Sequence, residues 1–171
     1  MQRLSKVFGR ILDGLMLAAC LLLLAMTLII CADVITRNTG HGGIAWSGEV
    51  SENIIYLITL MAAPWLLRQG QHIRVDILLR ALPARTAWLM EWAGDIIGLA
   101  CSLYFVWYGW QALAASYSAG AITIKTLVTP EWWMLAPLPV AFLLLAVEFL
   151  LRMHRLARAE RAPRTDAVSA S

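Results

Sequence analysis

Two carboxylates, Glu49 and Glu52, lie at the start of a long apolar segment of this chain. On a helix, Glu49, Glu52, Asn53 and Tyr56 fall at i, i+3, i+4 and i+7, so they share one face. Carboxylates at a membrane boundary are costly to desolvate unless they meet a partner, an ion or a paired charge. The spacing therefore predicts a polar helical face at this end of the segment.

Two interpretations of these carboxylates remain open. In the first, they lie in the first turn of a helix capped by Ser47, where the helix dipole and water stabilise them. In the second, one or both face a protein partner or pair with Arg37 across the preceding loop. Arg37 also follows Asp33 by four residues, so a local ion pair with a structural role is expected there.

A second polar segment places a histidine among basic residues after the apolar run. Arg68, His72, Asp76 and Arg80 recur at every fourth position, and the residues between them supply an apolar side. This pattern predicts a short amphipathic helix on the cytoplasmic surface that ends at Pro83, with a solvated loop as the alternative. We expect His72 to hydrogen bond with Asp76, because a proton relay would need further ionisable groups at membrane depth.

Other kinds of chemistry lack the residues they need. A haem-binding membrane bundle needs paired histidines within its spans, and His41, His72 and His154 fall outside the apolar segments. Motifs such as Gly-x-Ser-x-Gly or His-Glu-x-x-His do not occur, so we expect no enzyme, no catalytic residue and no bound metal or cofactor. Packing is the expected role of the cysteines, which lack CxxC spacing. They are Cys20, Cys31 and Cys101.

The composition identifies the elements that must position these residues. Of the 171 residues, 60% are hydrophobic and 15% are charged, which is too apolar for a soluble domain. A helix needs about 20 apolar residues to cross a bilayer. Four segments meet this requirement, so we predict an all-α integral membrane protein with four transmembrane helices. They lie at about 14–35, 50–67, 96–119 and 132–151.

Basic residues set the expected orientation. Of the 14 Lys and Arg residues, only Arg37 and Lys125 lie in the loops after the first and third apolar segments. The positive-inside rule therefore places both termini and the middle loop in the cytoplasm. We expect residues 1–156 to form a single four-helix membrane domain and residues 157–171 a mobile cytoplasmic tail. Because the basic residues flank apolar segments and form no single patch, we exclude nucleic-acid binding.

The first apolar segment has one alternative interpretation. Residues 17–20, Leu-Ala-Ala-Cys, resemble a lipoprotein processing box behind a basic N-terminus. The apolar run continues to Ile30, so cleavage there would leave a long apolar stretch at a new N-terminus. We therefore expect an uncleaved membrane span.

Tryptophans and charges near the predicted span ends are typical of membrane anchors. Five tryptophans lie near these ends: Trp46, Trp65, Trp92, Trp132 and Trp133. Trp107 and Trp110 fall deeper, so we expect them to pack against another helix. Glu148 precedes Arg152 by one turn and is expected to pair with it as an anchor, with coupling-ion binding as the alternative.

The distribution of charge argues against a transporter that acts alone. Such a protein is expected to have repeated halves and broken helices at mid-depth, and these spans show neither a repeat nor a central charged residue. The residues therefore favour an accessory membrane subunit. Two alternatives stay open, a free-standing small membrane exporter that relies on Glu148 and a structural membrane-assembly protein.

Three blocks of residues carry a resemblance to a known family. Residues 33–37 lead into 46–49, where an arginine is followed by a Trp-x-x-Glu pattern. Residues 68–76 are similar to an arginine-glycine-x-histidine-hydrophobic-x-x-aspartate signature, and residues 126–137 resemble the beginning of the family's last helix. On these blocks the chain resembles the DctQ-type small permease subunit of tripartite ATP-independent periplasmic (TRAP) transporters. The glycine-rich residues 38–45 depart from the family pattern.

The resemblance implies a bacterial inner-membrane, multi-pass subunit of a sodium-driven transporter that takes up an organic acid. Its implied partners are a large permease subunit, a periplasmic substrate-binding protein and membrane phospholipid. The large subunit would hold the substrate and ion sites, while this chain would extend its scaffold and help to dock the binding protein. On the outer side this implies contact roles for Arg37, Trp46, Glu49 and Glu52. On the cytoplasmic side it implies that a surface helix is shaped by His72, Arg74 and Asp76.

Overall fold

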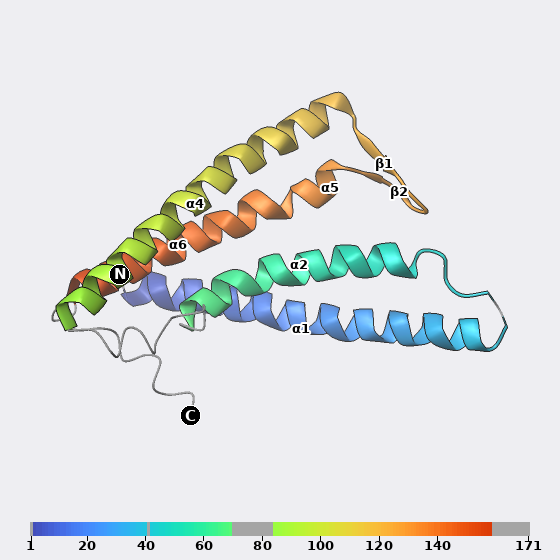
Figure 1. Ribbon diagram of the computed structural model, residues 1–171, viewed down its shortest axis with the longest axis horizontal. Coiled ribbons are helices and arrows are strands. Elements are labelled where there is room, and N and C mark those ends of the chain that lie inside the picture. Colours follow the sequence, from blue (N-terminus) through green and yellow to red (C-terminus); the bar gives the residue numbers. More distant parts are fainter. Residues whose placement is uncertain (1, 41, 70–83, 159–171) are drawn as a thin grey trace.

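The computed structural model describes residues 2–40, 42–69 and 84–158, and helices dominate it (Figure 1). Two short strands form a hairpin between the third and fourth long helices. The helices are α1 (Gln2–Asn38), α2 (Ser47–Arg68), α4 (Ala84–Ala119), α5 (Trp132–Leu135) and α6 (Pro137–Arg158). The strands are β1 (Ile122–Ile124) and β2 (Val128–Pro130).

Four helical segments are long and apolar enough to cross a membrane, as predicted. They are Val7–Asn38, Ser47–Arg68, Trp88–Ala119 and Trp132–Ala157. Each predicted span lies inside one of them, so the four-helix membrane fold is confirmed. The helices are longer than predicted because charged residues near their ends remain helical. The predicted surface helix after α2 lies outside the described residues. Of the predicted tail, residues 157–171, the structure describes only Ala157 and Arg158, which still belong to helix α6.

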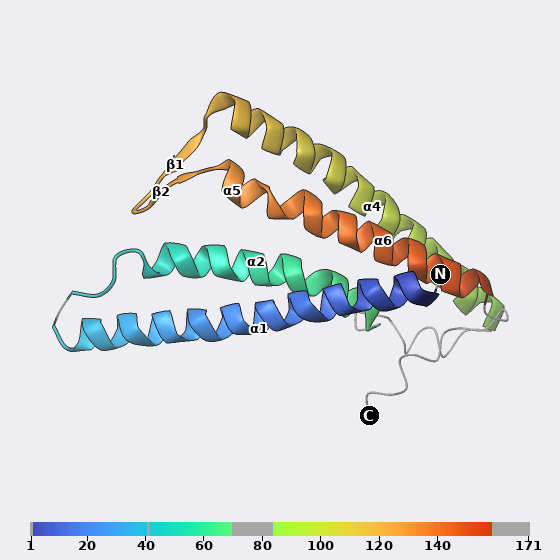
Figure 2. The same cartoon turned by 180° about the vertical axis from the view of Figure 1, so that it is seen from behind.

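The four long helices are arranged as an open row in the order α1, α2, α6, α4. Helix α2 contacts both α1 and α6, and α4 packs on α6. Two helix pairs, α1 with α2 and α4 with α6, meet at one end and diverge toward the other (Figures 1 and 2). We call the meeting end, where α1 begins and α6 finishes, the terminal end. We call the opposite end, which carries the two strands, the hairpin end.

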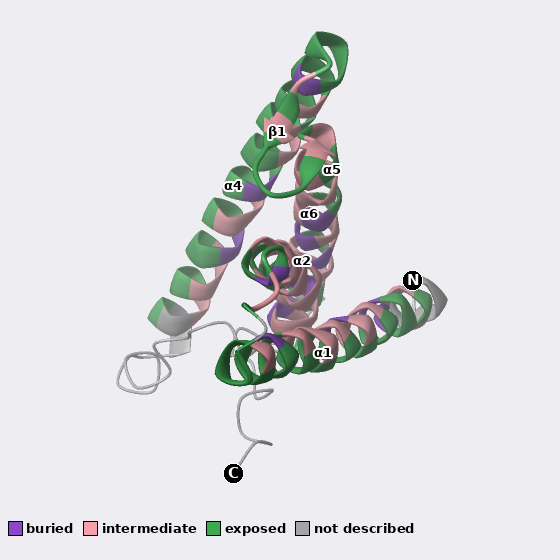
Figure 3. Ribbon diagram, turned by 90° about the vertical axis from the view of Figure 1, so that its right-hand side faces the viewer, coloured by how far each residue is buried: buried purple, intermediate pink, exposed green. Residues whose placement is uncertain are grey.

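The core of this row is small, and most apolar side chains point outward. The buried apolar residues are Leu12, Ala19, Leu67, Ala141, Leu145, Ala146 and Leu156. Figure 3 shows that the outer sides of α1 and α4 are largely exposed. Glycines let α4 approach α6, because a Cβ on Gly98 would overlap the Phe149 ring and one on Gly109 would lie 2.6 Å from Leu138 Cδ2.

Two expectations about packing are wrong within this chain. Trp107 and Trp110 do not pack against another of its described helices, since each is 64% exposed on α4. The three cysteines are also exposed rather than packed in the core. The reason is the open row, which leaves α1 and α4 with one main neighbour each among the long helices and therefore with broad outward faces.

A hairpin that was not predicted from the sequence follows α4. Gly120 has a φ of +61°, and Ala121 N donates to Ser116 O at 3.1 Å, which is the bonding of a Schellman helix end. The chain then reverses through two antiparallel strands in which Ile124 pairs with Val128. The β-branched residues of both strands were the available signal.

Candidate functional site

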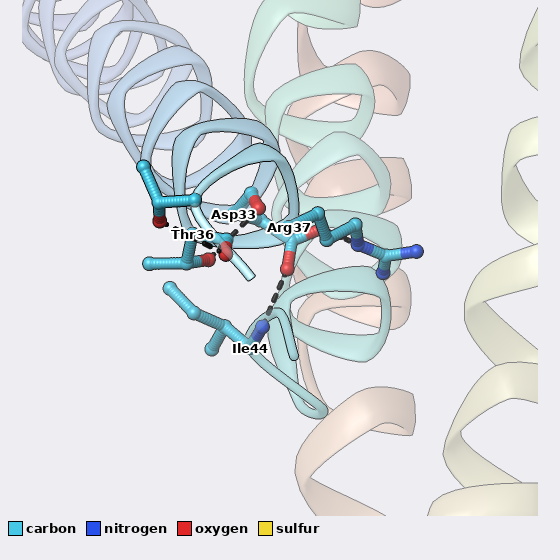
Figure 4. Close-up of polar contacts among 5 residues, drawn as sticks. Asp33, Thr36, Arg37 and Ile44 are labelled. Carbon is cyan, nitrogen blue, oxygen red and sulfur yellow. Dashed lines mark hydrogen bonds and ion pairs between the residues drawn. The ribbon is translucent and has the colours of Figure 1, made fainter. Parts of the chain in front are cut away.

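Asp33 closes the loop between α1 and α2 at the hairpin end (Figure 4). Its Oδ2 accepts a hydrogen bond from Arg37 Nε at 2.9 Å, which confirms the predicted local ion pair. Its Oδ1 accepts from Ile44 N at 2.6 Å, so the carboxylate also holds the far side of the loop. Asp33 is 8% exposed, whereas the Arg37 side chain is 66% exposed. The buried carboxylate is therefore structural, and the guanidinium is available at the surface.

Gly43 allows this loop to pass close to the ion pair. Its φ is +76°, a left-handed backbone conformation that side chains rarely adopt. A Cβ at this position would lie 2.7 Å from Arg37 Cγ and 3.2 Å from Asp33 Oδ1. The glycine is required by both its backbone and its surroundings.

Glu49 and Glu52 connect α2 to the hairpin. Glu49 accepts hydrogen bonds from the backbone N–H groups of Thr126, at 2.5 Å, and Leu127, at 2.9 Å. Glu52 forms an ion pair with Lys125 Nζ at 3.1 Å, and both side chains are largely exposed. These three contacts involve Glu49, Glu52 and the hairpin turn 125–127, and we call these residues the outer latch. The latch joins the two helix pairs where they are farthest apart (Figure 1).

Two details of the predicted carboxylate site need correction. Arg37 forms its ion pair with Asp33, one turn away on the same helix, and not with Glu49 or Glu52 across the loop. Ser47 is not the N-cap of α2, because Trp46 takes that position without a side-chain hydrogen bond and Ser47 is already helical. The hairpin supplies the donors that the carboxylates need, so neither Arg37 nor a serine cap is required.

A cavity of about 500 Å³ lies beside the outer latch, between α2, the hairpin, α5 and the start of α6. All four polar residues that the sequence spacing places on one face of α2 line this cavity, which confirms that they share a face. The lining residues are Glu49, Glu52, Asn53, Tyr56, Thr123, Lys125, Leu127, Thr129, Glu131, Met134, Leu135 and Leu138. The lining thus combines charged, polar and apolar side chains, three of them acidic. Within the described ranges, no group of three His, Cys, Asp or Glu side chains could hold a metal ion.

Glu148 lies at the centre of a second charged cluster, at the terminal end. Its side chain is 0% exposed and forms ion pairs with Arg155 Nη2 at 2.5 Å and with Arg68 Nη1 at 3.7 Å. The predicted pair with Arg152 is therefore wrong. Arg152 pairs instead with Asp95 of α4 at 3.3 Å and donates to the carbonyl of Leu67 at 3.1 Å.

This cluster ties the four long helices together. Arg68 comes from α2, Asp95 from α4, and Glu148, Arg152 and Arg155 from α6; we call these five residues the inner lock. Helix α1 joins them because Gly9 leaves space for Arg68, whose Nη2 would lie 2.8 Å from a Cβ there. A hydrogen bond of 3.0 Å from Trp65 Nε1 to Asp13 Oδ1 adds a further link between α1 and α2. Buried charges that are paired in this way are costly to separate.

The structure brings four of the seven predicted contact residues to the same end. Arg37, Trp46, Glu49 and Glu52 all lie at the hairpin end, and Trp46 is 41% exposed. The other three, His72, Arg74 and Asp76, lie outside the described residues. Sequence reasoning missed the hairpin turn as the partner of the carboxylates. It also missed the inner lock, whose members come from three helices and share no local spacing.

Comparison with known proteins identifies the family. The family model described as "Tripartite ATP-independent periplasmic transporters, DctQ component" matches residues 26–159. The ectoine TRAP transporter small permease protein TeaB of Halomonas elongata is 28% identical over 144 residues, which cover 81% of this chain and 70% of that protein. The sialic acid TRAP transporter permease protein SiaT of Haemophilus influenzae is 22% identical over 130 residues, 75% of this chain but only 20% of that protein. Because the family model covers more than half of its length, this membrane protein belongs to the DctQ family of TRAP transporter small permease components.

Proposed function

We propose that this chain is the static accessory subunit of a three-part uptake system. It would scaffold a large permease subunit and help to dock a periplasmic substrate-binding protein, with the sodium gradient driving uptake of an organic acid. It would have no enzymatic activity of its own. The observation that carries the proposal is the pairing of charges at both ends of the row. The inner lock and the outer latch hold the helices in a fixed frame, as a scaffold requires.

The relatives support the choice of partners. One relative is named a small permease of an ectoine TRAP transporter, and the other is a sialic acid TRAP permease of which this chain matches a fifth. A small permease implies a large one, and "tripartite" and "periplasmic" in the family description imply a binding protein. Sialic acid and ectoine both carry a carboxylate, which supports an organic acid as the class of substrate.

The hairpin end is the proposed docking side, which places it in the periplasm of a bacterial inner membrane. The positive-inside count supports this orientation, because the hairpin end carries Arg37 and Lys125 alone of the basic residues. The Arg37 and Glu52 side chains are each 66% exposed there, and Trp46 is partly exposed beside them. Charged and aromatic groups of this kind favour recognition by another protein.

The terminal end is the proposed assembly side, in the cytoplasm. His72, Arg74 and Asp76 would shape a surface helix there that supports the complex. Phospholipid is the proposed neighbour of the outward aliphatic face of α1. A free-standing exporter is less well supported, because it would need an accessible carboxylate at depth and the Glu148 side chain is 0% exposed between two arginines.

Reconstitution by omission tests this proposal. The chain, its large permease partner and the soluble binding protein would be combined in proteoliposomes and offered a panel of radiolabelled carboxylic acids. We expect uptake with all three components and an inward sodium gradient. Equal uptake without this chain would contradict the scaffold role, and equal uptake without the gradient would contradict sodium coupling.

A further inference from the structure

One face of α4 is exposed and rich in aromatic rings. Leu103, Trp107, Trp110 and Tyr117 follow one another at intervals of four, three and seven residues, so they share one side of the helix. Their exposed fractions lie between 52% and 69%. We propose that this aromatic face is the surface on which the large permease subunit packs. The inference deepens the proposed function and rests on it.

The aromatic face lies near the middle of the membrane span. Asp95, in the inner lock, and Ala119, the last residue of α4, bracket the span, and the midpoint between them falls at Trp107. At about 1.5 Å per residue, Leu103 and Trp110 lie within about 6 Å of that midpoint along the helix. A hydrocarbon core extends about 15 Å to either side of its centre. Leu103, Trp107 and Trp110 are therefore at hydrocarbon depth, whereas Tyr117, about 15 Å from the midpoint, lies at the edge of the hydrocarbon core.

Tryptophan is an unusual residue to expose to lipid at this depth. Trp and Tyr are enriched at the two membrane interfaces, where their polar groups reach water or headgroups. The rings of Trp107 and Trp110 are each 64% exposed, so contacts within the chain leave most of their surface uncovered. An indole N–H at mid-depth finds no acceptor in lipid chains, but a neighbouring helix can offer a carbonyl or a polar side chain.

The outer face of α1 provides the contrast. Its most exposed large side chains are equally open, with exposed fractions between 58% and 64%, and these five are all aliphatic. They are Leu17, Leu21, Leu24, Leu28 and Ile35. Such side chains carry no hydrogen-bonding group and are satisfied by lipid. The two faces are similarly exposed but differ in chemistry. We therefore assign the α4 face to contact with a protein and the α1 face to contact with lipid.

The relatives favour a large membrane protein over a second copy as the occupant. In the sialic acid TRAP permease, the segment that aligns with this chain makes up 20% of one longer permease. The remainder of that permease is therefore always present beside the segment. An expectation from the sequence also fits this assignment, because Trp107 and Trp110 were predicted to pack against another helix and both are 64% exposed among the described helices of this chain.

Site-specific photocrosslinking in the native membrane tests the inference. Trp107→p-benzoylphenylalanine and Trp110→p-benzoylphenylalanine would be compared with Leu21→p-benzoylphenylalanine and Leu24→p-benzoylphenylalanine, which have similar exposure on α1. We expect the α4 positions to crosslink to the large permease several-fold more than the α1 positions. Crosslinks to the permease mainly from α1, or from α4 mainly to a second copy of this chain, would overturn the inference.

A second measurement separates failure of this inference from failure of the proposed function. If the wild-type tagged chain brings down no large permease at all, the proposed function fails. If the permease co-elutes, the double variant Trp107→Ala with Trp110→Ala should lower its yield by about tenfold, as loss of central aromatic anchors does. Leu21→Ala with Leu24→Ala should leave the yield unchanged. Equal yields from the two double variants would overturn the assignment of the face, with the proposed function intact.

Discussion

Gly43 and Asp33 show how single residues fix the hairpin end. The buried carboxylate holds Arg37 on one side and the Ile44 amide on the other, and the loop passes close enough only because Gly43 lacks a side chain. Strain at such a left-handed position typically costs about 1–3 kcal/mol. The geometry thus links the identity of one glycine to the position at which α2 begins.

We predict that Gly43→Ala destabilises the protein by about 1–3 kcal/mol, because it adds backbone strain and a clash with Arg37. Thermal unfolding in detergent would measure this as a lower midpoint. Gly14→Ala is the matched control, since a Cβ at that helical position meets no atom within 4 Å. A midpoint lowered equally in both variants would contradict this account of the loop.

Glu148 provides the second prediction at this scale. Removing one partner of a fully buried ion pair typically costs about 3–5 kcal/mol. Glu148→Ala should cost less than that, because the side chains of Arg68 and Arg155 are 22% and 45% exposed. The variant should still have a clearly lower unfolding midpoint, because Arg68 and Arg155 lose their buried counter-ion. Glu52→Ala should cost at most about 1 kcal/mol, since its ion pair with Lys125 is largely exposed. Similar losses in the two variants would argue against an inner lock.

At the scale of elements, the hairpin and α2 form one unit through the outer latch. Glu49 accepts two backbone hydrogen bonds from the hairpin turn, so the strands are held against α2 rather than left as a free loop. The acidic cavity beside the latch depends on this contact, because its walls come from α2 on one side and the hairpin on the other.

We predict that Glu49→Gln with Glu52→Gln releases the hairpin. Hydrogen exchange at the Thr126 and Leu127 amides should become faster, and substrate uptake should fall while membrane insertion stays normal. Ser118→Ala, which loses only a hydrogen bond within α4, should leave both readings unchanged. Full uptake by the double variant at normal complex yield would contradict a docking role for the hairpin end.

Sequence reasoning was reliable for elements whose signal is local. An apolar run of about 20 residues identifies a membrane span by itself, so all four spans were found. The Asp33 and Arg37 pair was found for the same reason, because i and i+4 meet on any helix. The hairpin was missed because its three-residue strands are too short to show an alternating pattern. The inner lock was missed because it depends on which helices become neighbours.

At the scale of the whole molecule, the open row of helices explains which helices are joined to one another and which helix faces are exposed. Helices α2 and α6 lie in the middle, and charges join the row at each end. The outer faces of α1 and α4 are left for other molecules. Such a frame is what the proposed scaffold role requires.

Cysteine labelling tests the predicted orientation of this frame. In a variant with Cys20, Cys31 and Cys101 replaced, Thr126→Cys in the hairpin should react with a membrane-impermeant maleimide added to intact cells. Ser171→Cys at the C-terminus should react only after the membrane is opened. The reverse pattern would place the hairpin in the cytoplasm and would contradict the positive-inside prediction.

The central claim is that this chain works as one subunit of a larger membrane complex. Native mass spectrometry of the complex purified through a tag on this chain tests it most directly. We predict one copy of the chain bound to one large polytopic permease, which would make that permease the place to look for substrate and sodium sites. Recovery of the chain alone, or only as its own oligomer, would contradict the claim and favour a self-sufficient small transporter.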